Sequence, residues 1–490
     1  MYGYQKSERR IRILPLLIGL AGAVLVGLAL TVQVRSWGAL GTEAGGSCGT
    51  NRGPCPRGTS WTIPLSIIAL LLVVPVAIAG ISRSGTRAIG WIVAVAFAVA
   101  GVLPGAKVFD LAHGVSLNTV WAVPPDRPAE PEALGSWQNG STVVRARFDG
   151  VAAYDVATGR QVWTYTIPAP EVLCAMSRTV EGGVGLVGHA AEGMPCTYVS
   201  AVDLASGREL WEKDLPAAQL PSSMTADVVA VSRETAVLQT QQTLQGFTLR
   251  EGARRWEQKV TDRCHFDKVI AGGDQVVADL GCIGAPPRIR AIDAVTGRTR
   301  WEVPVPIRTP SANLTLLSAA PAVVYVQESG QRGTRTVTIF DAKGRASEPI
   351  QRDDGRRRLD IDPHGFSAAP VYRLFVQDGL LIVSASLDGG RESVVAFGLS
   401  DGRERWSKQV SDVRTMQVEA GRVVYLDDQT ISPHLRSMSL RDGKETYLGV
   451  TGFRWVTANL ALYLTGGRYV FVADRATTPD THPIAAVQAR

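Results

Sequence analysis

The chain divides into two parts by its pattern of hydrophobic and polar positions. In the N-terminal part, three apolar runs are nearly free of charge: Ile13 to Val34, Trp61 to Ile81 and Ala88 to Leu103. The first two reach the roughly 20 apolar residues that a helix needs to cross a bilayer, and Ala106 extends the third. Farther along, apolar and polar residues alternate in short segments, which is typical of strands. The sequence predicts three membrane-spanning helices, about 13–34, 61–81 and 88–106, followed by an all-β domain.

One short phrase recurs seven times between residues 151 and 449, for example VAAYDVATGRQVW, VSAVDLASGRELW and IRAIDAVTGRTRW. An alternating strand runs into a turn, where glycine supplies the positive φ that other residues adopt only at a cost. A second strand then leaves the turn. The turn glycines are 41 to 58 residues apart, a period that indicates propeller blades or a solenoid: Gly159, Gly207, Gly252, Gly297, Gly344, Gly402 and Gly443.

Large rings recur at one repeat position, four residues after the glycine. Their recurrence indicates packing slots between neighbouring sheets. These structural tryptophans are Trp163, Trp211, Trp256, Trp301 and Trp406; Glu348 and Tyr447 replace them in the fifth and seventh repeats. A small residue ahead of the acidic position suits a tight inner face: Ala153, Ala201, Ala291 and Ala396. Further strand-turn-strand stretches upstream give about four strands per repeat, the blade of a β-propeller.

The number of blades depends on how the ring closes. If Trp455 to Leu464 and Arg468 to Asp474 return to complete the first sheet, which begins only at about Ser136, the count is seven. Such a closure removes open sheet edges. If these last strands form a sheet with little help from the N-terminus, the count is eight. We predict an all-β propeller of seven four-stranded blades, with eight as the alternative, after a three-helix transmembrane region.

The phrase A-x-D-x-x-T-G-x-x-x-W resembles the tryptophan-docking repeat of propellers of the pyrroloquinoline quinone (PQQ) type. That family includes quinoprotein dehydrogenases and the propeller lipoprotein of the outer-membrane β-barrel assembly machinery. The resemblance covers roughly residues 134 to 476 and is strongest in repeats one, two and four. It implies the propeller fold but leaves the function open, because one fold hosts many functions.

Basic residues beside the spans predict the topology. Lys6, Arg9, Arg10 and Arg12 precede the first span, and Arg83 and Arg87 lie between the second and third. Both segments are expected in the cytoplasm, which places the propeller outside. A cleaved signal peptide is the alternative for the first run. The expected order is a cytoplasmic N-terminus at 1–12, helices within 13–106 with an external loop at 35–60, a Pro-rich linker at 107–133, the propeller at 134–476 and a tail at 477–490.

The cysteines all fall in segments that this topology places outside, and they divide into three local pairs. Disulfides are expected in an oxidising compartment. The midpoint between Cys264 and Cys282 falls in a Gly-Gly-Asp turn, so antiparallel pairing would bring them side by side. The expected pairs are Cys48 with Cys55, Cys174 with Cys196, and Cys264 with Cys282. Buried free thiols are the alternative, and the spacing does not favour zinc.

A charged insertion between the fifth and sixth repeats is a candidate binding loop. It contains Arg352, Asp353, Asp354, Gly355, Arg356, Arg357 and Arg358, followed by Asp360, Asp362 and His364. We favour a solvated, self-paired loop, because charge runs usually face solvent; a binding loop on one face of the disc is the alternative. No local motif indicates catalysis, and His113, His189 and His265 are isolated along the chain.

These features favour a non-catalytic, membrane-tethered scaffold outside the cytoplasm that binds a protein or envelope component on its propeller face. The net charge of +6 is spread thinly, and no basic stripe supports nucleic-acid binding. The alternative is a PQQ-dependent quinoprotein-like dehydrogenase. The resemblance implies that such an enzyme has eight blades, PQQ, calcium, a carboxylate base and often a disulfide between adjacent cysteines. Here no cysteines are adjacent, so we expect no cofactor and no metal site.

Overall fold

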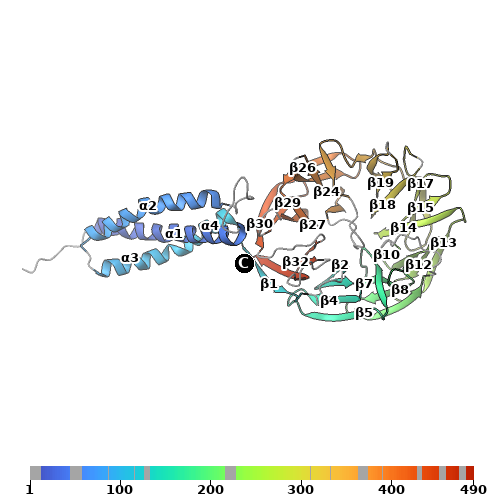
Figure 1. Cartoon of the computed structure of the whole chain (residues 1–490), viewed down its shortest axis with the longest axis horizontal. Helices are drawn as coiled ribbons and strands as arrows, with labels where there is room; N and C mark the ends of the chain where they lie inside the picture. The colour runs from blue at the N-terminus through green and yellow to red at the C-terminus, as the bar shows by residue number, and fades with distance from the viewer. Residues whose placement is uncertain are drawn as a thin grey trace, which may run out of the picture.

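The computed structural model describes residues 13–44, 58–85, 88–114, 116–125, 133–215, 228–309, 311–330, 333–361, 373–388, 390–427, 433–451, 460–473 and 482–489. A helical bundle and a ring of sheets make up the molecule (Figure 1). The bundle contains α1 (Ile13–Ala44), α2 (Thr59–Arg83), α3 (Ala88–Ala100) and α4 (Val102–His113).

Three helical stretches are long and apolar enough to cross a membrane: Ile13–Gly41, Thr59–Arg83 and Ala88–His113. The third combines α3 and α4, because the Gly101 N–H at their junction still donates to the Phe97 and Ala98 carbonyls at 3.2 and 3.0 Å. It therefore continues past the expected end at residue 106. Large apolar side chains on the outside of the bundle are exposed, as expected for helices that face lipid.

Polar contacts inside the bundle lie toward its propeller end. The Ser36 and Thr62 hydroxyls are 2.8 Å apart, and the Ser66 hydroxyl donates to the Gln33 side chain. Arg35 pairs with Asp110 at 3.1 Å. Such contacts between helices satisfy polar groups that lipid would leave without partners.

The β domain is a propeller of four-stranded antiparallel sheets, each with its first strand nearest the centre of the ring. Blade 1 contains β2 (Ala133–Asn139), β3 (Thr142–Arg147), β4 (Gly150–Asp155) and β5 (Gln161–Thr166). Blade 2 contains β6 (Glu171–Met176), β7 (Val184–Ala191), β8 (Tyr198–Asp203) and β9 (Glu209–Asp214). Blade 3 contains β10 (Val229–Ser232), β11 (Thr235–Gln239), β12 (Thr243–Thr248) and β13 (Arg254–Lys259).

The following blades continue around the ring. Blade 4 contains β14 (Cys264–Gly272), β15 (Gln275–Cys282), β16 (Arg288–Asp293) and β17 (Thr299–Pro304). Blade 5 contains β18 (Ala312–Ala319), β19 (Ala322–Glu328), β20 (Arg335–Phe340) and the short β21 (Ile350–Gln351). Blade 6 has an inner position shared by β22 (Arg357–Leu359) and β23 (Leu374–Gln377), then β24 (Leu380–Leu387), β25 (Arg391–Gly398) and β26 (Glu404–Val410).

The two remaining blades close the ring. Blade 7 contains β27 (Val413–Glu419), β28 (Arg422–Asp427), β29 (His434–Ser439) and β30 (Glu445–Thr451). Blade 8 contains β31 (Leu460–Thr465), β32 (Arg468–Ala473), β33 (Ile484–Ala489) and, as its outer strand, β1 (Ser116–Ala122). A short parallel contact between β1 and β30 joins these two blades into one sheet.

The propeller fold is thus as predicted, but the preferred count of seven blades is wrong: the described strands form eight. Blade 1 is complete without the C-terminal strands, because β2 already supplies its inner strand. Those strands, β31 and β32, instead form a separate sheet in which β32 pairs with β33 and β33 pairs with β1. This pairing closes the ring and completes blade 8 with four strands, so no sheet edge stays open there.

The limits expected for the propeller are also too narrow at both ends. Residues 107–113 of the expected linker belong to α4, and 116–122 form β1. The expected tail at 477–490 contains β33. Neither strand belongs to a repeat phrase, so the sequence pattern does not mark it.

The repeated turn has a local physical cause. In the turn of blade 1, Asp155 accepts hydrogen bonds from the backbone N–H and the hydroxyl of Thr158, at 2.8 and 2.7 Å. Gly159 then has φ of +70°, a conformation that favours glycine. Equivalent aspartate bonds occur in the turns of blades 2 and 4. The phrase therefore encodes its hairpin through short-range contacts.

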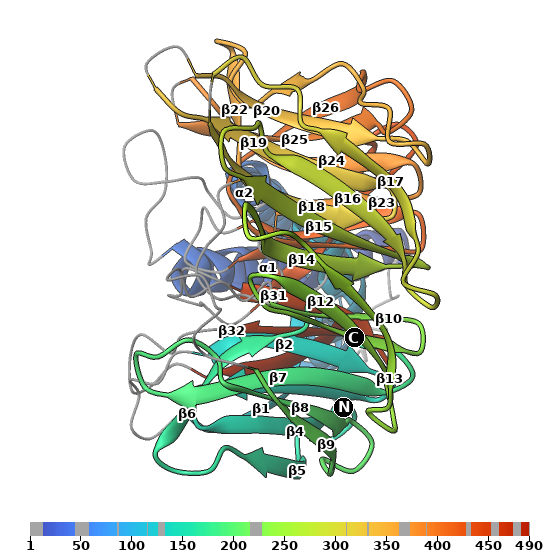
Figure 2. The ribbon, with the colours of Figure 1, turned by 90° about the vertical axis from the view of Figure 1, so that its right-hand side faces the viewer.

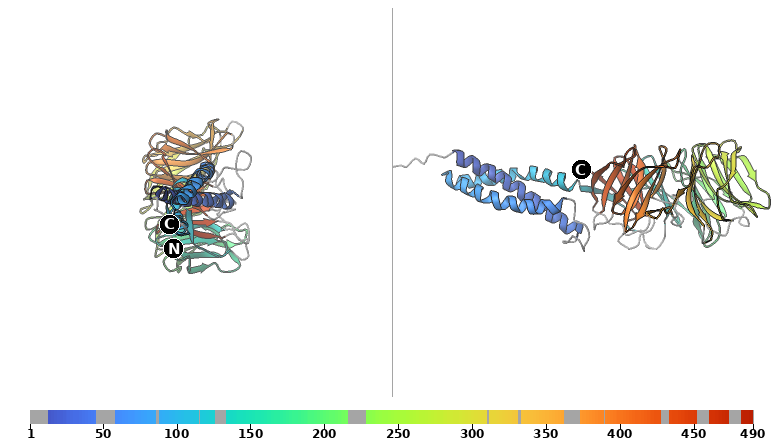
Figure 3. Two further views of the ribbon diagram at one scale, coloured as in Figure 1. Left: turned by 90° about the vertical axis from the view of Figure 1, so that its left-hand side faces the viewer. Right: turned by 90° about the horizontal axis from the view of Figure 1, so that it is seen from above.

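The bundle projects from the rim of the disc beside β1 and β30, so that both faces of the disc remain clear of it (Figures 1 and 3). At the joint, α4 ends where the Gly114 N–H donates to the Asp110 carbonyl at 2.8 Å. Gly114 has φ of +101°, and a Cβ there would lie 1.7 Å from Cε1 of Tyr447 on β30. The joint is therefore packed directly against blade 7.

Candidate functional site

The repeated tryptophans lie between neighbouring blades, where each packs on the turn glycine of the next blade. A Cβ on Gly207 would lie 2.5 Å from the Trp163 ring, and the Trp163 indole N–H donates to the Leu204 carbonyl at 3.1 Å. The same arrangement holds for Trp211 and Trp256, and for Trp406. In each case the indole is buried, so these rings cannot serve as an exposed ligand surface.

The small residues named above have a direct role in this packing. Ala153, Ala201, Ala291 and Ala396 pair across the sheet with Trp163, Trp211, Trp301 and Trp406, in that order. All four alanines are buried. A small partner beside each ring leaves space for the indole within the sheet stack.

A further docking tryptophan was missed because it lies outside the repeat phrases. Trp121 on β1 is buried, its indole N–H donates to the Val156 carbonyl at 2.8 Å, and a Cβ on Gly159 would lie 2.5 Å from its ring. Trp121 therefore docks blade 8 on blade 1. At the inner end of the same boundary, the Ser136 hydroxyl on β2 and the Tyr463 hydroxyl on β31 are 2.8 Å apart.

The two repeats that lack the tryptophan, at Glu348 and Tyr447, pack differently from each other. Tyr447 packs on Gly114 at the helix joint, so it occupies a docking position with a glycine from outside the repeats. Near Glu348, the turn glycine Gly402 instead meets the Glu348 carbonyl and the Ile350 side chain. A cleft of about 730 Å³ lies between blades 5 and 6, lined by Ile339, Phe340, Leu399 and neighbouring turns.

Two of the expected cysteine pairs are disulfides in the structure. Cys174 is joined to Cys196, and Cys264 to Cys282. In the second pair the cysteines are opposite each other on β14 and β15. Both bonds lie on the face where the inner strands of the blades begin, which we call the disulfide face. Cys48 and Cys55 lie outside the described residues.

The charged insertion is largely paired with its own surroundings. Arg357 contacts Asp354 at 3.3 Å and Glu404 at 2.7 Å. Asp360 pairs with Arg373 at 3.0 Å. The buried Arg352 donates to the Leu359 carbonyl at 3.3 Å. This part of the insertion is a hairpin that joins blades 5 and 6; Asp362 and His364 lie outside the described residues.

One histidine that is isolated along the sequence has polar partners in space. His189 Nε2 lies 3.3 Å from the Ser200 hydroxyl, and its Nδ1 contacts the Glu171 carboxylate. This order of groups resembles a hydrolytic triad. However, Ser200 is 0% exposed and its hydroxyl donates to Glu209 at 3.1 Å. A substrate carbonyl cannot reach a buried hydroxyl that already binds a carboxylate, so the cluster stabilises blade 2.

A pocket of about 440 Å³ lies on the disulfide face between blades 4 and 5. Its walls come from β14, β15, the β15–β16 loop and the start of β18. The polar residues that line it are His265, Asp267, Lys268, Asp279, Ser311 and Asn313. Of these residues, only His265 was named in the sequence analysis, as a histidine with no catalytic partner nearby in the sequence.

Asp279 is a buried carboxyl group in the wall of this pocket. It is 4% exposed, and burial together with the nearby charge of Asp267 raises its pKa to about 7, while Lys268 opposes the shift. The His265 ring lies over Gly281, where a Cβ would be 2.8 Å from Cε1 and Nε2. His265 Nε2 lies 3.3 Å from an Asp267 carboxylate oxygen.

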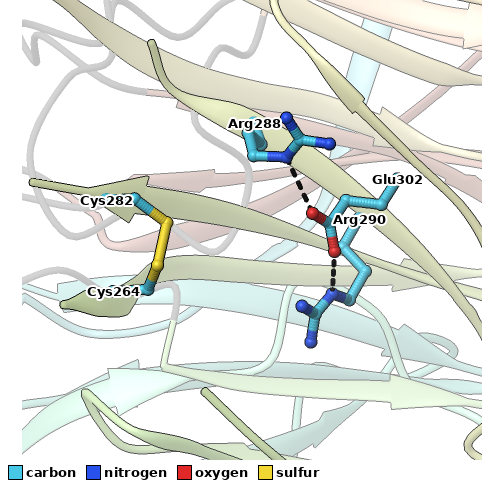
Figure 4. The surroundings of a disulfide bond; sticks show 5 residues. All are labelled: Cys264, Cys282, Arg288, Arg290 and Glu302. Atoms are coloured by element: carbon cyan, nitrogen blue, oxygen red, sulfur yellow. Dashed lines mark hydrogen bonds and ion pairs between the residues drawn. A yellow bond between two sulfur atoms is a disulfide. The ribbon is translucent and has the colours of Figure 1, made fainter. Parts of the chain in front are cut away.

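The neighbourhood of the pocket is held by charged pairs. Figure 4 shows the Cys264–Cys282 disulfide beside Arg288 and Arg290, each of which bonds Glu302 at 2.7 Å. Burial opposes ionisation of Glu302, but the hydrogen bonds from Arg290 and Arg288 outweigh it and lower the pKa of Glu302. These pairs fix the outer part of blade 4 beside the pocket wall.

A second pocket, of about 330 Å³, lies toward the axis on the opposite face. It is lined by the ends of inner strands from blades 4, 5 and 6, and by Arg178 and Thr179 of blade 2. The Arg178 guanidinium donates to the Leu316 carbonyl of blade 5 at 2.5 Å. The described lining has no carboxylate that could hold calcium, so these residues do not fit a PQQ–calcium pair.

The ring of four-stranded blades and the docked tryptophans define a PQQ-like β-propeller. The chain belongs to the family described as outer membrane protein assembly factor BamB, whose model matches residues 109–263 and again 196–446. No curated protein sequence matches the chain.

The chain is similar to several solved structures. BamB from Moraxella catarrhalis is 15% identical, with a TM-score of 0.45 over 76% of this chain and 100% of that chain. The quinohemoprotein alcohol dehydrogenase ADHIIG from Pseudomonas putida HK5 is 12% identical, with a TM-score of 0.46 over 76% of this chain and 75% of that chain. AztD from Citrobacter koseri is 14% identical, with a TM-score of 0.36 over 57% of this chain and 72% of that chain.

Proposed function

We propose that this protein is a membrane-tethered, extracytoplasmic propeller that acts as a non-catalytic scaffold and binds a protein of the cell envelope. The observation that carries the proposal is the joint between bundle and disc. β1 follows α4 after a short connection and is also the outer strand of the closing blade. Packing of Gly114 against Tyr447 fixes this joint, so the disc is held by its rim with both faces accessible.

Two independent features support a location outside the cytoplasm. Basic residues before the first span and between the second and third favour a cytoplasmic position for those segments. The two disulfides on the propeller are characteristic of oxidising compartments. With three spans, a cytoplasmic N-terminus places the disc outside.

We expect protease added to intact protoplasts or spheroplasts to remove the propeller and leave the first residues of the chain protected. Non-reducing peptide mapping of freshly isolated membranes should recover Cys264 linked to Cys282. A folded propeller that is cleaved only after lysis, with free thiols at both positions, would show that the orientation is reversed.

Photo-crosslinking in intact cells tests the binding function. Ile283, which is 70% exposed, and Met194, which is 53% exposed, lie on the disulfide face; Val162 on the outer strand β5 is 53% exposed and serves as the control. A photoreactive residue at Ile283 or Met194 should give a discrete protein adduct, and one at Val162 should not. Absence of an adduct from every exposed position of the disc would refute the scaffold function.

The quinoprotein alternative predicts a different result. Adding PQQ and calcium to the purified full-length protein would then change its absorbance and support dye-linked oxidation of alcohols or sugars. We expect neither change, because the axial pocket offers a single arginine and no carboxylate among its described lining residues.

A further inference from the structure

The pocket between blades 4 and 5 contains a carboxyl group that the fold itself does not pair. Asp279 is 4% exposed and lines the pocket, and no hydrogen bond or ion pair reaches its side chain within the described part of the chain. Buried polar groups in proteins are nearly always hydrogen-bonded, because removing a charge from water without compensation is costly. An unpaired carboxyl in a pocket wall therefore indicates a ligand that supplies the missing donors.

The surrounding residues supply a second carboxyl and leave it accessible. A β-bulge in β14 falls at Asp267, between Phe266 and Lys268, opposite the strand that carries Asp279. Bulges redirect side chains beside functional sites. The Asp267 carboxylate is 38% exposed and lies close enough to raise the pKa of Asp279 by its charge.

The cation that the pocket already contains is held by the opposite wall. Lys268 Nζ donates to the Asn313 side-chain oxygen at 3.0 Å and to the Leu314 carbonyl at 2.5 Å, both on β18. Its ammonium group is thus anchored to blade 5, and no ion pair joins it to Asp279 in the part of the chain that the structure describes. Asp267 lies 3.3 Å from His265 Nε2, and both carboxyl groups line the pocket that an incoming cation would enter.

We propose that this pocket binds the guanidinium group of an arginine side chain, presented by the protein partner of the scaffold, between Asp279 and Asp267. The inference rests on the proposed binding function and specifies its contact. A guanidinium has five donors in a planar fork, which suits two carboxyl groups better than a single ammonium does. Ile283, Pro287 and Leu314 line the same pocket and can contact the methylene stem.

A protein source is favoured over a metal ion or a free amine. No group of three or more metal-binding side chains among the described residues is arranged to hold a metal ion. Ile283 is 70% exposed at the border of the pocket, so an apolar contact is available beside the charged one. Arginine is enriched among the residues that contribute most to binding in protein interfaces, where it fills desolvated pockets.

The first test uses the full-length protein in detergent micelles and Nα-acetyl-L-arginine amide as the probe. We expect the probe to raise the thermal midpoint of the propeller at pH 8, and its norleucine counterpart to have no effect. Asp279→Asn should weaken binding about tenfold or more, the scale of one charge-assisted contact. Asp442→Asn, which removes an exposed carboxylate from a turn of blade 7, should bind like the parent.

The pH dependence of probe binding is a further test, because a purely structural role of Asp279 would not make binding depend on its protonation. Because burial holds the Asp279 pKa at about 7, binding of the arginine probe should weaken between pH 8 and pH 5 as the carboxylate gains a proton. Asp267, Lys268 and His265 face the same pocket and are present in both variants. The difference between parent and Asp279→Asn therefore isolates Asp279. No stabilisation by the probe at pH 8, or equal stabilisation by norleucine, would overturn the proposal.

The second test separates the pocket from the scaffold function. The adduct formed from position 283 in cells should be lost in Asp279→Asn and kept in Asp442→Asn. An adduct that persists in Asp279→Asn refutes the arginine contact but leaves the scaffold function intact. If the parent forms no adduct anywhere on the disc, the scaffold function itself fails. A cooperative unfolding transition at pH 5 verifies that Asp279→Asn is folded.

Discussion

Replacing Trp121 with Ala should lower the free energy of unfolding of the propeller by about 3–5 kcal/mol, the usual cost of removing a large aromatic from a core. The Trp121 ring is buried between blades 8 and 1 and its indole N–H is bonded to the Val156 carbonyl. Its strand β1 also closes the ring, so the substitution weakens the one boundary that joins the two ends of the propeller.

Urea unfolding of the full chain in detergent, followed by pulse proteolysis, measures this effect. Two conservative variants provide a matched control for the hydrogen-bond contribution. Trp211→Phe removes the indole bond to the Leu249 carbonyl, whereas the buried Trp301 N–H has no partner within the described residues. Trp301→Phe should therefore cost less than Trp211→Phe by about 1 kcal/mol, the value of a typical hydrogen bond. Parent-like unfolding of Trp121→Ala would show that the ring does not close as described.

The stability of the propeller should fall as pH rises from about 4 to about 7, through Asp279. Its folded-state pKa is raised from 3.8 to about 7 by burial and by Asp267, so the folded protein retains a proton that the unfolded chain has lost. The resulting stability is complete below the unfolded pKa and is lost as pH passes through the folded pKa. A shift of this size corresponds to on the order of 4 kcal/mol.

Asp279→Asn should remove this slope, since an amide does not titrate. The measurement is the urea midpoint of both proteins at pH 5 and pH 8, in the absence of any ligand. The parent should lose stability between these values relative to Asp279→Asn, even if the buried amide lowers the absolute stability of the variant. Equal slopes for the two proteins would show that the Asp279 carboxyl is ionised throughout.

The two pockets differ in what they offer a ligand. The axial pocket is crossed at its edge by Arg178, which already bonds the Leu316 carbonyl, and the rest of its described lining is small or apolar. The pocket on the disulfide face has an unpaired buried carboxyl. Figure 2 views the disc along its edge, with the helical bundle behind the ring of blades. The bundle joins the disc beside β1 and β30, whereas this pocket lies between blades 4 and 5.

Much of the architecture is determined by the sequence because it is encoded locally. Each repeat phrase contains its own turn, in which Asp155 and Thr158 bond each other before Gly159, and the phrase implies a hairpin without reference to the rest of the chain. The apolar runs are long enough to define three spans by length alone. Cys264 and Cys282 flank a tight turn, so their proximity follows from strand pairing.

Only the tertiary structure decided the number of blades and the position of the candidate site. β1 and β33 pair across more than 360 residues of chain, and β1 carries Trp121 without any repeat phrase, so no local signal marks either strand. Asp279 and Asn313 reach the same pocket from two different blades. In the sequence, nothing distinguishes Asp279 from any other polar residue of an alternating strand. Its burial without a partner arises from the packing of blade 4 against blade 5, a non-local interaction that sequence periodicity does not contain.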